Sequence, residues 1–128
     1  PDKTVSGGSV TVSSAVSEAY VGQGFSGVIK PSRPEFGTPT GTSQGRKKRA
    51  NQILVRLVNT TGIKINGDQI PFRSSADAMG SPPAAFTGDK KVMNLGYDRD
   101  GFVEIKQDQP LDFHVVAVIM DMNVGEHF

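Results

Sequence analysis

The residues with the clearest chemical potential form one run of cations, Arg46-Lys47-Lys48-Arg49. Four adjacent positive charges could contact a phosphate backbone, and each cation placed on a phosphate would release counterions and make binding depend on salt. The same run could contact an acidic surface of a neighbouring protein, serve as a nuclear localisation signal, or form the solvated beginning of a strand. We predict that Arg46→Glu with Lys48→Glu leaves the isolated domain folded, as a solvated run would allow, but weakens assembly. Phe36 is the nearest upstream aromatic residue, so no stacking platform for bases accompanies the run.

Other reactive side chains are sparse. The chain has two histidines and no cysteine, which excludes disulfides and thiolate chemistry. His114 alternates with apolar residues and is expected to be a half-buried structural histidine, whereas His127 lies at the chain end. The sequence contains no phosphate-binding glycine loop, no His-Glu-x-x-His and no nucleophile elbow. We therefore expect a protein that is not an enzyme and that carries no catalytic residues, no metal and no cofactor.

One acidic segment superficially resembles a calcium loop, namely Asp98-Arg99-Asp100-Gly101. However, a glycine at the fourth place breaks the order of positions in an EF-hand, and the next residues, Phe102-Val103, are typical of a strand. Aspartate and glycine are also common turn formers. The segment is therefore predicted to be a hairpin turn.

Length and composition indicate one small domain. A chain of 128 residues can bury roughly two thirds of its unfolded surface in a single core. The formal net charge is +1, so no overall attraction to nucleic acid or to a membrane is expected. Fifteen glycines and eight prolines disfavour long helices and favour short strands joined by turns. Because the first residue is Pro1, we expect residues 1–128 to be either an excised domain of a longer chain or a processed product.

The segment 46–58, which begins with the cations, fits either a helix or a strand. Ile53, Val55 and Leu57 would share one face of a strand, and the alternation continues into Thr60–Ile65. Asn66-Gly67 then provides the strongest short hairpin signal. The sequence therefore favours a strand.

Two polar segments, 31–45 and 74–88, are rich in Pro and small residues and are predicted to be long loops. The strand at Asp112–Gly125 is expected to be central in a sheet, so that Phe113→Ala or Ile119→Ala would cost about 2–5 kcal/mol. About eight short strands predict an all-β fold, a single-domain antiparallel sandwich or a partly closed barrel. The other predicted strands are Ser9–Ser13, Glu18–Gly22, Phe25–Lys30, and Asp89–Leu95 paired with Phe102–Lys106.

An ordered series of motifs carries a resemblance to a known family. The motifs are Gly41-Thr42-Ser43-Gln44-Gly45 with Arg46–Arg49, Arg56 among alternating Ile, Val and Leu, Pro71-Phe72-Arg73, Met79-Gly80-Ser81-Pro82-Pro83, Phe86-Thr87-Gly88-Asp89, Gly96–Gly101 and Gln107-Asp108-Gln109-Pro110-Leu111. In this order they resemble the C-terminal region of tail tubular protein B, the tail nozzle protein of short-tailed bacteriophages. The earlier stretch Tyr20–Phe25 resembles a strand that precedes this region in the family.

The resemblance implies a structural part of the phage virion, made in the bacterial host cytoplasm. Its partners would be other copies of the parent chain in a hexameric ring, adjacent tail proteins and, transiently, the DNA that passes through the channel during ejection. No membrane partner is implied. Arg46, Lys47, Lys48 and Arg49 then become candidate contacts for assembly or for phosphate. The family protein is several times longer, and its propeller portion is absent from this chain.

A second class of function fits the same fold, namely a β-sandwich module that binds a carbohydrate or a protein partner. Carbohydrate modules usually present Trp or Tyr platforms. This chain has no Trp, and its tyrosines are Tyr20 and Tyr97.

Overall fold

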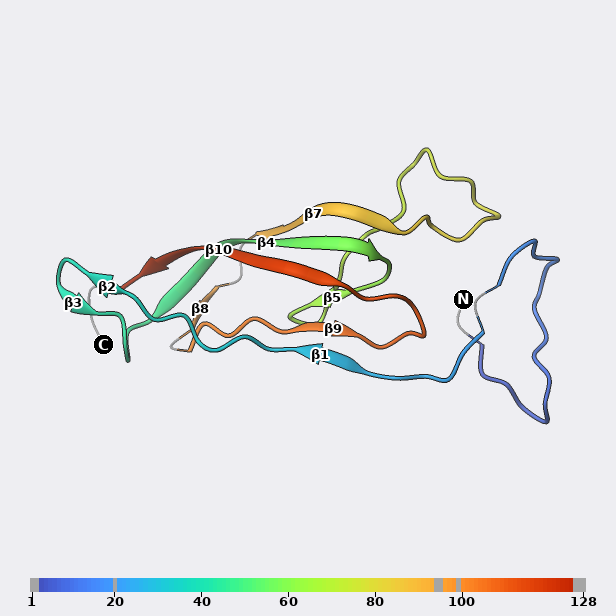
Figure 1. Cartoon of the computed structure of the whole chain (residues 1–128), viewed down its shortest axis with the longest axis horizontal. Coiled ribbons are helices and arrows are strands. Elements are labelled where there is room, and N and C mark those ends of the chain that lie inside the picture. The colour runs from blue at the N-terminus through green and yellow to red at the C-terminus, as the bar shows by residue number, and fades with distance from the viewer. Residues whose placement is uncertain (1–2, 20, 94–95, 99, 126–128) are drawn as a thin grey trace.

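The computed structural model describes residues 3–19, 21–93, 96–98 and 100–125. These residues form strands and no helix, which confirms the predicted all-β class (Figure 1). The strands are β1 (Gly27–Ile29), β2 (Gly37–Thr38), β3 (Gly41–Thr42), β4 (Lys48–Thr60), β5 (Lys64–Ile65), β6 (Asp68–Gln69), β7 (Phe86–Met93), β8 (Tyr97–Asp98), β9 (Ile105–Gln107) and β10 (Val115–Val124).

The strands build two facing antiparallel sheets and one small hairpin. The first sheet has the order β10-β4-β7, with β8 also paired to β4, and the second has the order β1-β9-β5-β6. The hairpin is β2-β3. Figure 1 shows β10, β4 and β7 as one layer above β1, β9 and β5. Neither sheet closes into a barrel among the described residues, so the fold is sandwich-like.

The strand β4 is the centre of the first sheet and confirms the prediction of a strand for 46–58, except that the strand begins at Lys48. It pairs with both β10 and β7. Asn51 is an extra residue opposite β10, and one more residue of β4 is extra opposite β7 between Leu57 and Thr60. Each such bulge moves the inward-facing positions by one residue. The inward side chains are therefore Lys48 and Ala50, then Ile53, Val55 and Leu57, then Thr60.

The core lies between the two sheets. Three of its members come from the middle of β4, and the second sheet and its connections supply most of the others. Its buried apolar residues are Ala50, Ile53, Val55, Leu57, Ile63, Ile65, Ile70, Val103 and Ile105. The predicted hairpin at Asn66-Gly67 is confirmed, because it joins β5 to β6 with φ angles of 50° and 86°. These positive angles at both central positions suit Asn and Gly.

The position of β10 corrects the prediction of a central strand. Among the described residues β10 pairs with β4 on one side only, so it is an edge strand. Its alternation is also displaced at its start, because Val116 is an extra residue opposite β4. Ile119 consequently faces outward with 51% of its surface exposed, whereas Phe113 packs partly buried against the core. The cost of about 2–5 kcal/mol expected for truncating Ile119 is therefore wrong.

The predicted hairpin between Asp89–Leu95 and Phe102–Lys106 is also wrong. The strand β7 pairs with β4 in the first sheet, whereas β9 pairs with β1 and β5 in the second. Between them, β8 pairs with the start of β4. The chain thus crosses between layers instead of turning back on itself. Asn94, Leu95 and Arg99 lie outside the described residues.

The N-terminal segment forms less structure than its sequence predicts. In residues 3–24, Tyr20 lies outside the described part, and the others form one isolated bridge, Ser6 to Ser9, in place of the strands predicted at Ser9–Ser13 and Glu18–Gly22. All the described residues of this segment are exposed, so their strand propensity meets no partner strand and no core. Of the predicted loops, 31–45 contains the hairpin β2-β3, and 74–88 is irregular until β7 begins at Phe86.

Candidate functional site

The four cations do not form the solvated run that one interpretation proposed. Arg46 and Lys48 are buried, with 6% and 0% of their surfaces exposed, whereas Lys47 is exposed and Arg49 is partly buried. Lys48 is the first residue of β4 and faces inward there, whereas Arg46 lies before the strand and is buried against the hairpin through its contacts with Thr40. Two of the four candidate contacts are thus turned into the protein.

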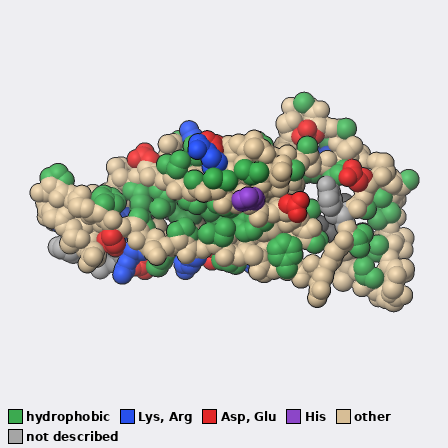
Figure 2. Space-filling view, in the orientation of Figure 1, with side chains coloured by type: hydrophobic (Ala, Val, Ile, Leu, Met, Phe, Trp, Pro, Cys, Tyr) green, Lys and Arg blue, Asp and Glu red, His purple; other side chains and the backbone are tan. Residues whose placement is uncertain are grey.

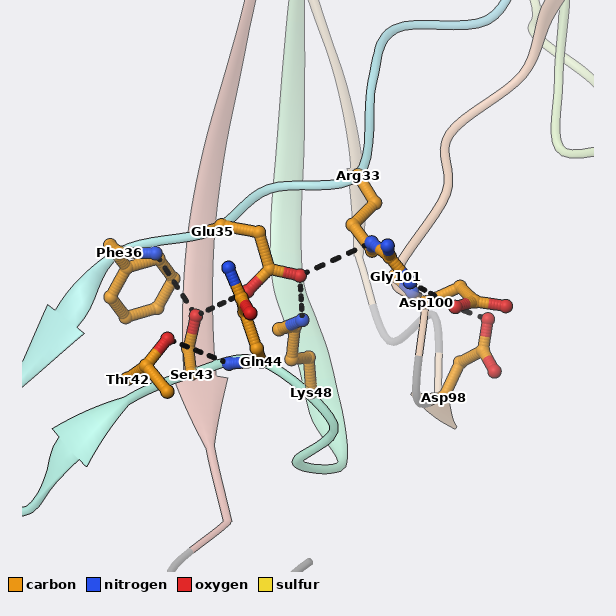
Figure 3. Close-up of polar contacts among 10 residues, drawn as sticks. All are labelled: Arg33, Glu35, Phe36, Thr42, Ser43, Gln44, Lys48, Asp98, Asp100 and Gly101. Atoms are coloured by element: carbon orange, nitrogen blue, oxygen red, sulfur yellow. Dashed lines mark hydrogen bonds and ion pairs between the residues drawn. The ribbon is translucent and has the colours of Figure 1, made fainter.

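The ammonium group of Lys48 is held by Glu35, from the segment that links β1 to β2. Lys48 Nζ lies 2.9 Å from Glu35 Oε1, and Ser43 donates a hydrogen bond from Oγ to Glu35 Oε2 at 3.0 Å. Ser43 Oγ in turn accepts a hydrogen bond from the backbone N–H of Phe36 at 3.0 Å. Figure 3 shows these groups converging between β4 and the hairpin. A buried ammonium requires such pairing, because leaving it unpaired would be strongly destabilising.

A second cation approaches the same carboxylate from the solvent side. Arg33 Nε lies 3.3 Å from Glu35 Oε1, and Arg33 Nη1 lies 3.2 Å from Asp100 Oδ1 (Figure 3). The pKa of Glu35 is lowered, first because Lys48 donates a hydrogen bond to it, and further by Ser43 and by the charges of Lys48 and Arg33, while burial opposes these effects. Glu35, Ser43, Lys48, Arg33 and Asp100 are called the Glu35 cluster below.

The carboxylates of Asp98 and Asp100 also form contacts within the chain, and Asp100 belongs to the Glu35 cluster. Asp100 accepts the ion pair from Arg33, and Asp98 Oδ2 accepts a hydrogen bond from the backbone N–H of Gly101 at 3.3 Å. Among the residues that the structure describes, no group of three or more His, Cys, Asp or Glu side chains is placed to hold a metal ion. The carboxylates of this segment thus serve the fold locally.

The remaining cations of the run also contact the chain itself. Arg46 donates to the hydroxyl and to the carbonyl oxygen of Thr40 at 2.7 and 3.0 Å, and so fixes the tip of the hairpin β2-β3. The guanidinium of Arg49 lies 5.7 Å from the ring centre of Tyr97. Lys47 is the member of the run whose side chain is exposed. A contact of Lys47 with phosphate or with a neighbouring protein stays a prediction.

Two grooves with apolar lining residues lie outside the Glu35 cluster, and the second is next to it. The first has a volume of about 340 Å³ and is lined by Ile70, Phe72, Pro82, Pro83 and Leu111, with Arg73 at its border. The second, of about 320 Å³, lies between the link from β1 to β2 and the strand β10, and its lining residues are Pro34, Phe36, Met120 and Met122.

His114 is exposed, which corrects the expectation of a half-buried histidine. It precedes β10, and its backbone forms hydrogen bonds with the end of β4. The carbonyl oxygen of His114 accepts a hydrogen bond from Val58 N–H at 3.1 Å, and its N–H donates one to Thr60 Oγ1 at 2.9 Å. His127 lies outside the described residues. No helix long and apolar enough to cross a membrane occurs in the part of the chain that the structure describes.

Sequence reasoning missed the partners of the cations. Glu35 is a single acid in a polar loop, 13 residues before Lys48, and no local pattern joins them. The signal that could have helped is the run itself: cations at the start of a strand alternate between its two faces, so one of Lys48 and Arg49 faces inward and needs an acid.

No protein-family model, no curated protein and no solved structure matches this chain. The resemblance to tail nozzle proteins therefore rests on the ordered motifs of the sequence.

Proposed function

We propose that this chain is a structural domain of a phage tail tube or nozzle protein, which contributes to tail assembly and to the channel for DNA ejection. The single observation that carries the proposal is the ordered series of motifs from Gly41 to Leu111. On this proposal the protein is located in the virion, and its partners are other copies of the parent chain and adjacent tail proteins.

The places that the motif residues occupy support a structural role. Ser43 and Lys48, from the first motif, hold Glu35 and so attach the hairpin β2-β3 to β4. Asp89, from a later motif, receives two hydrogen bonds from Arg56 across the β4-β7 pair at 2.9 and 3.2 Å. Motif residues that brace strands and turns suit a protein selected for rigidity and for contact surfaces.

An experiment on particles tests the proposal. An antibody raised against the 128-residue chain should label phage particles released by cells that carry the gene, with gold at the tail in electron micrographs. Mass spectrometry of purified particles should detect the same chain. Particles without the chain, from cells that do contain it, would contradict the proposal.

The second candidate, a module that binds a carbohydrate or a protein, is favoured by Tyr97. Its side chain is exposed and has Arg49 over one face, and Phe102 and Phe25 are also exposed. Aromatic rings at a surface are the usual platform for sugar binding. A glycan array probed with the wild-type chain and with Tyr97→Ala tests this candidate: binding lost in the variant would favour it over the tail role.

A further inference from the structure

The described residues of the segment 3–24, called the N-terminal arm, lie exposed outside the sandwich. Its apolar side chains Val5, Val10, Val12, Val16 and Val21 are 53%, 43%, 46%, 53% and 81% exposed. The stretch Ser9-Val10-Thr11-Val12-Ser13 alternates small polar and β-branched residues, a pattern that is typical of a strand. The arm thus contains a sequence that is typical of a strand, but its described residues belong to no sheet.

The base of the arm directs it away from the strands of its own chain. Gly22 lies against the turn before β10 so closely that a Cβ added there would lie 2.9 Å from Cβ of Pro110. From this contact the arm continues beyond the end of the sandwich, at the right of Figure 1. It therefore extends towards the surroundings of the molecule instead of back along β10.

The strand β10 has the complementary feature, because one of its two edges has no neighbouring strand among the described residues. One side of β10 pairs with β4, and its other side pairs with no strand among the described residues. Natural sheet edges are usually short or protected by charges, because open edges bind other strands. The outer strand at the opposite edge, β7, carries Asp89, Lys90 and Lys91, whereas the ten residues of β10 include one charge, Asp121.

Apolar side chains accompany this open edge. Val116 and Ile119 of β10 are 56% and 51% exposed. The second groove lies beside the same strand, where Met120 and Met122 meet Pro34 and Phe36. Figure 2 shows hydrophobic side chains gathered between the layer of β10 and the layer of β1.

We propose that residues 9–13 of one copy add as a strand to the free edge of β10 in a second copy. Backbone hydrogen bonds between the strands would supply affinity, and alternate side chains would supply specificity. With this pairing, Val10 and Val12 share one face of the added strand and lie beside the outward-facing Val116 and Ile119, while Thr11 faces the groove side. Residues 4–17 carry no charge, which suits an edge with one charge.

The pairing joins two different surfaces of the chain. In a pair of copies, the one that donates its arm therefore keeps a free β10 edge, and the other keeps a free arm. Contacts of this kind produce a ring when the rotation between copies closes and a filament when it does not. The inference goes beyond the proposed virion role, because it concerns how any two copies of this chain associate. Failure of self-association would leave the labelling of particles unaffected, so the two proposals fail separately.

Sedimentation of the purified 128-residue chain tests the inference. The wild type should associate in a concentration-dependent manner below about 1 mM, the range of weak specific association. The arm variant, Val10→Lys with Val12→Lys, and the edge variant, Val116→Lys with Ile119→Lys, should each raise the dissociation constant at least about tenfold. All four positions are exposed, so both variants should keep the wild-type circular dichroism and melting temperature. The matched control, Val5→Lys with Val21→Lys, alters exposed valines outside residues 9–13 and should associate like the wild type.

A mixture of the two variants gives the sharpest result. The arm variant has an intact edge and the edge variant has an intact arm, so an equimolar mixture should recover association between the two as heterodimers. Wild-type chains that stay monomeric, or association that the arm variant retains, would overturn the proposal. Association that the arm variant retains would indicate pairing of β10 with β10, and a mixture that fails to recover association would show that the arm of one copy does not add to the edge of another.

Discussion

Lys48 Nζ and Glu35 Oε1 lie 2.9 Å apart, with the lysine side chain fully buried and the glutamate side chain 26% exposed. The pair joins the first residue of the central strand to the segment between β1 and β2. Because Ser43 and Arg33 contact the same carboxylate, Glu35 connects β4 to the hairpin β2-β3 and, through Arg33, to Asp100.

Removal of the buried ammonium should destabilise the protein. Lys48→Met keeps the apolar stem but removes the charged donor to Glu35, and we expect a loss of about 1.5–3 kcal/mol of unfolding free energy, the range for hydrogen bonds to charged groups. Lys47→Met is the matched control, because Lys47 is the exposed neighbour, and should change stability by no more than about 0.5 kcal/mol. Urea unfolding measures both. If both variants lost the same unfolding free energy, the buried contact of Lys48 with Glu35 would contribute nothing to stability.

The same contacts change the expectation for double charge reversal. Arg46→Glu with Lys48→Glu places two carboxylates in buried positions, one of them against Glu35, so we now expect an unfolded or strongly destabilised protein. Circular dichroism and the melting temperature of the variant provide the check. A variant with a wild-type melting curve would restore the solvated-run interpretation.

Acid should weaken the fold through the carboxylates that have lowered pKa values. The pKa of Glu35 in the folded state lies below its ordinary value, chiefly through the hydrogen bond from Lys48. Its contribution is therefore complete above the unfolded pKa, about 4.3, and is lost as pH falls through the lower folded pKa. Glu35→Gln should flatten the decline of the urea midpoint in this acid range.

Asp108 provides a comparison for this pH effect. Its pKa is also lowered, first by the hydrogen bond from Lys64, but its contact belongs to the opposite end of the second sheet. Asp108→Asn should remove a separate part of the acid slope, so the effects of the two variants should add. An unchanged slope in Glu35→Gln would mean that Glu35 does not link protonation to folding.

Leu57 and Ile119 are both apolar residues of predicted strands, but they differ in burial. Leu57, in the centre of β4, is fully buried, whereas Ile119 is 51% exposed on β10. Leu57→Ala should cost about 2–5 kcal/mol of unfolding free energy, and Ile119→Ala less than about 1.5 kcal/mol. Chemical denaturation of the two variants compares them directly. Similar costs would contradict the placement of β10 at the sheet edge.

The end of β4 depends on one buried hydroxyl. Thr60 Oγ1 accepts from His114 N–H at 2.9 Å and lies 2.9 Å from the carbonyl oxygen of Val58. Thr60→Val keeps the shape but leaves that N–H without its acceptor, which should cost about 1–3 kcal/mol. Thr87→Val is the control, since Thr87 Oγ1 also accepts a backbone N–H, from Asn59, at an exposed site. Hydrogen exchange at His114 should accelerate in the first variant alone.

Local patterns predicted the parts of the fold that depend on neighbouring residues. The alternation at Ile53, Val55 and Leu57 indicated a strand, and Asn66-Gly67 indicated a hairpin, because both signals report local backbone geometry. The place of β10 at an edge and the pairing of β9 with β1 could not be predicted in this way, since each depends on residues far apart in the chain. Alternation in β10 also says nothing about which side of the strand has a neighbour.

The candidate site illustrates the same limit. Arg46–Arg49 was identified as a group from its charge, yet its arrangement depends on Glu35 and Thr40, which lie in a loop whose hairpin was not predicted. Charge alone suggested a binding surface, whereas burial of two of the four cations indicates that much of the run stabilises the fold.

The extra residue Asn51 in β4 gives that strand an unusual sensitivity to length. Deletion of Asn51 would leave the composition of the strand nearly intact, yet it would reverse the facing of the strand residues before it, Lys48 to Ala50. Lys48 and Ala50 would turn outward, and Arg49 would turn inward without an acid placed to receive it. Many substitutions along β4 could therefore be accommodated, whereas the loss or gain of a single codon near position 51 could not.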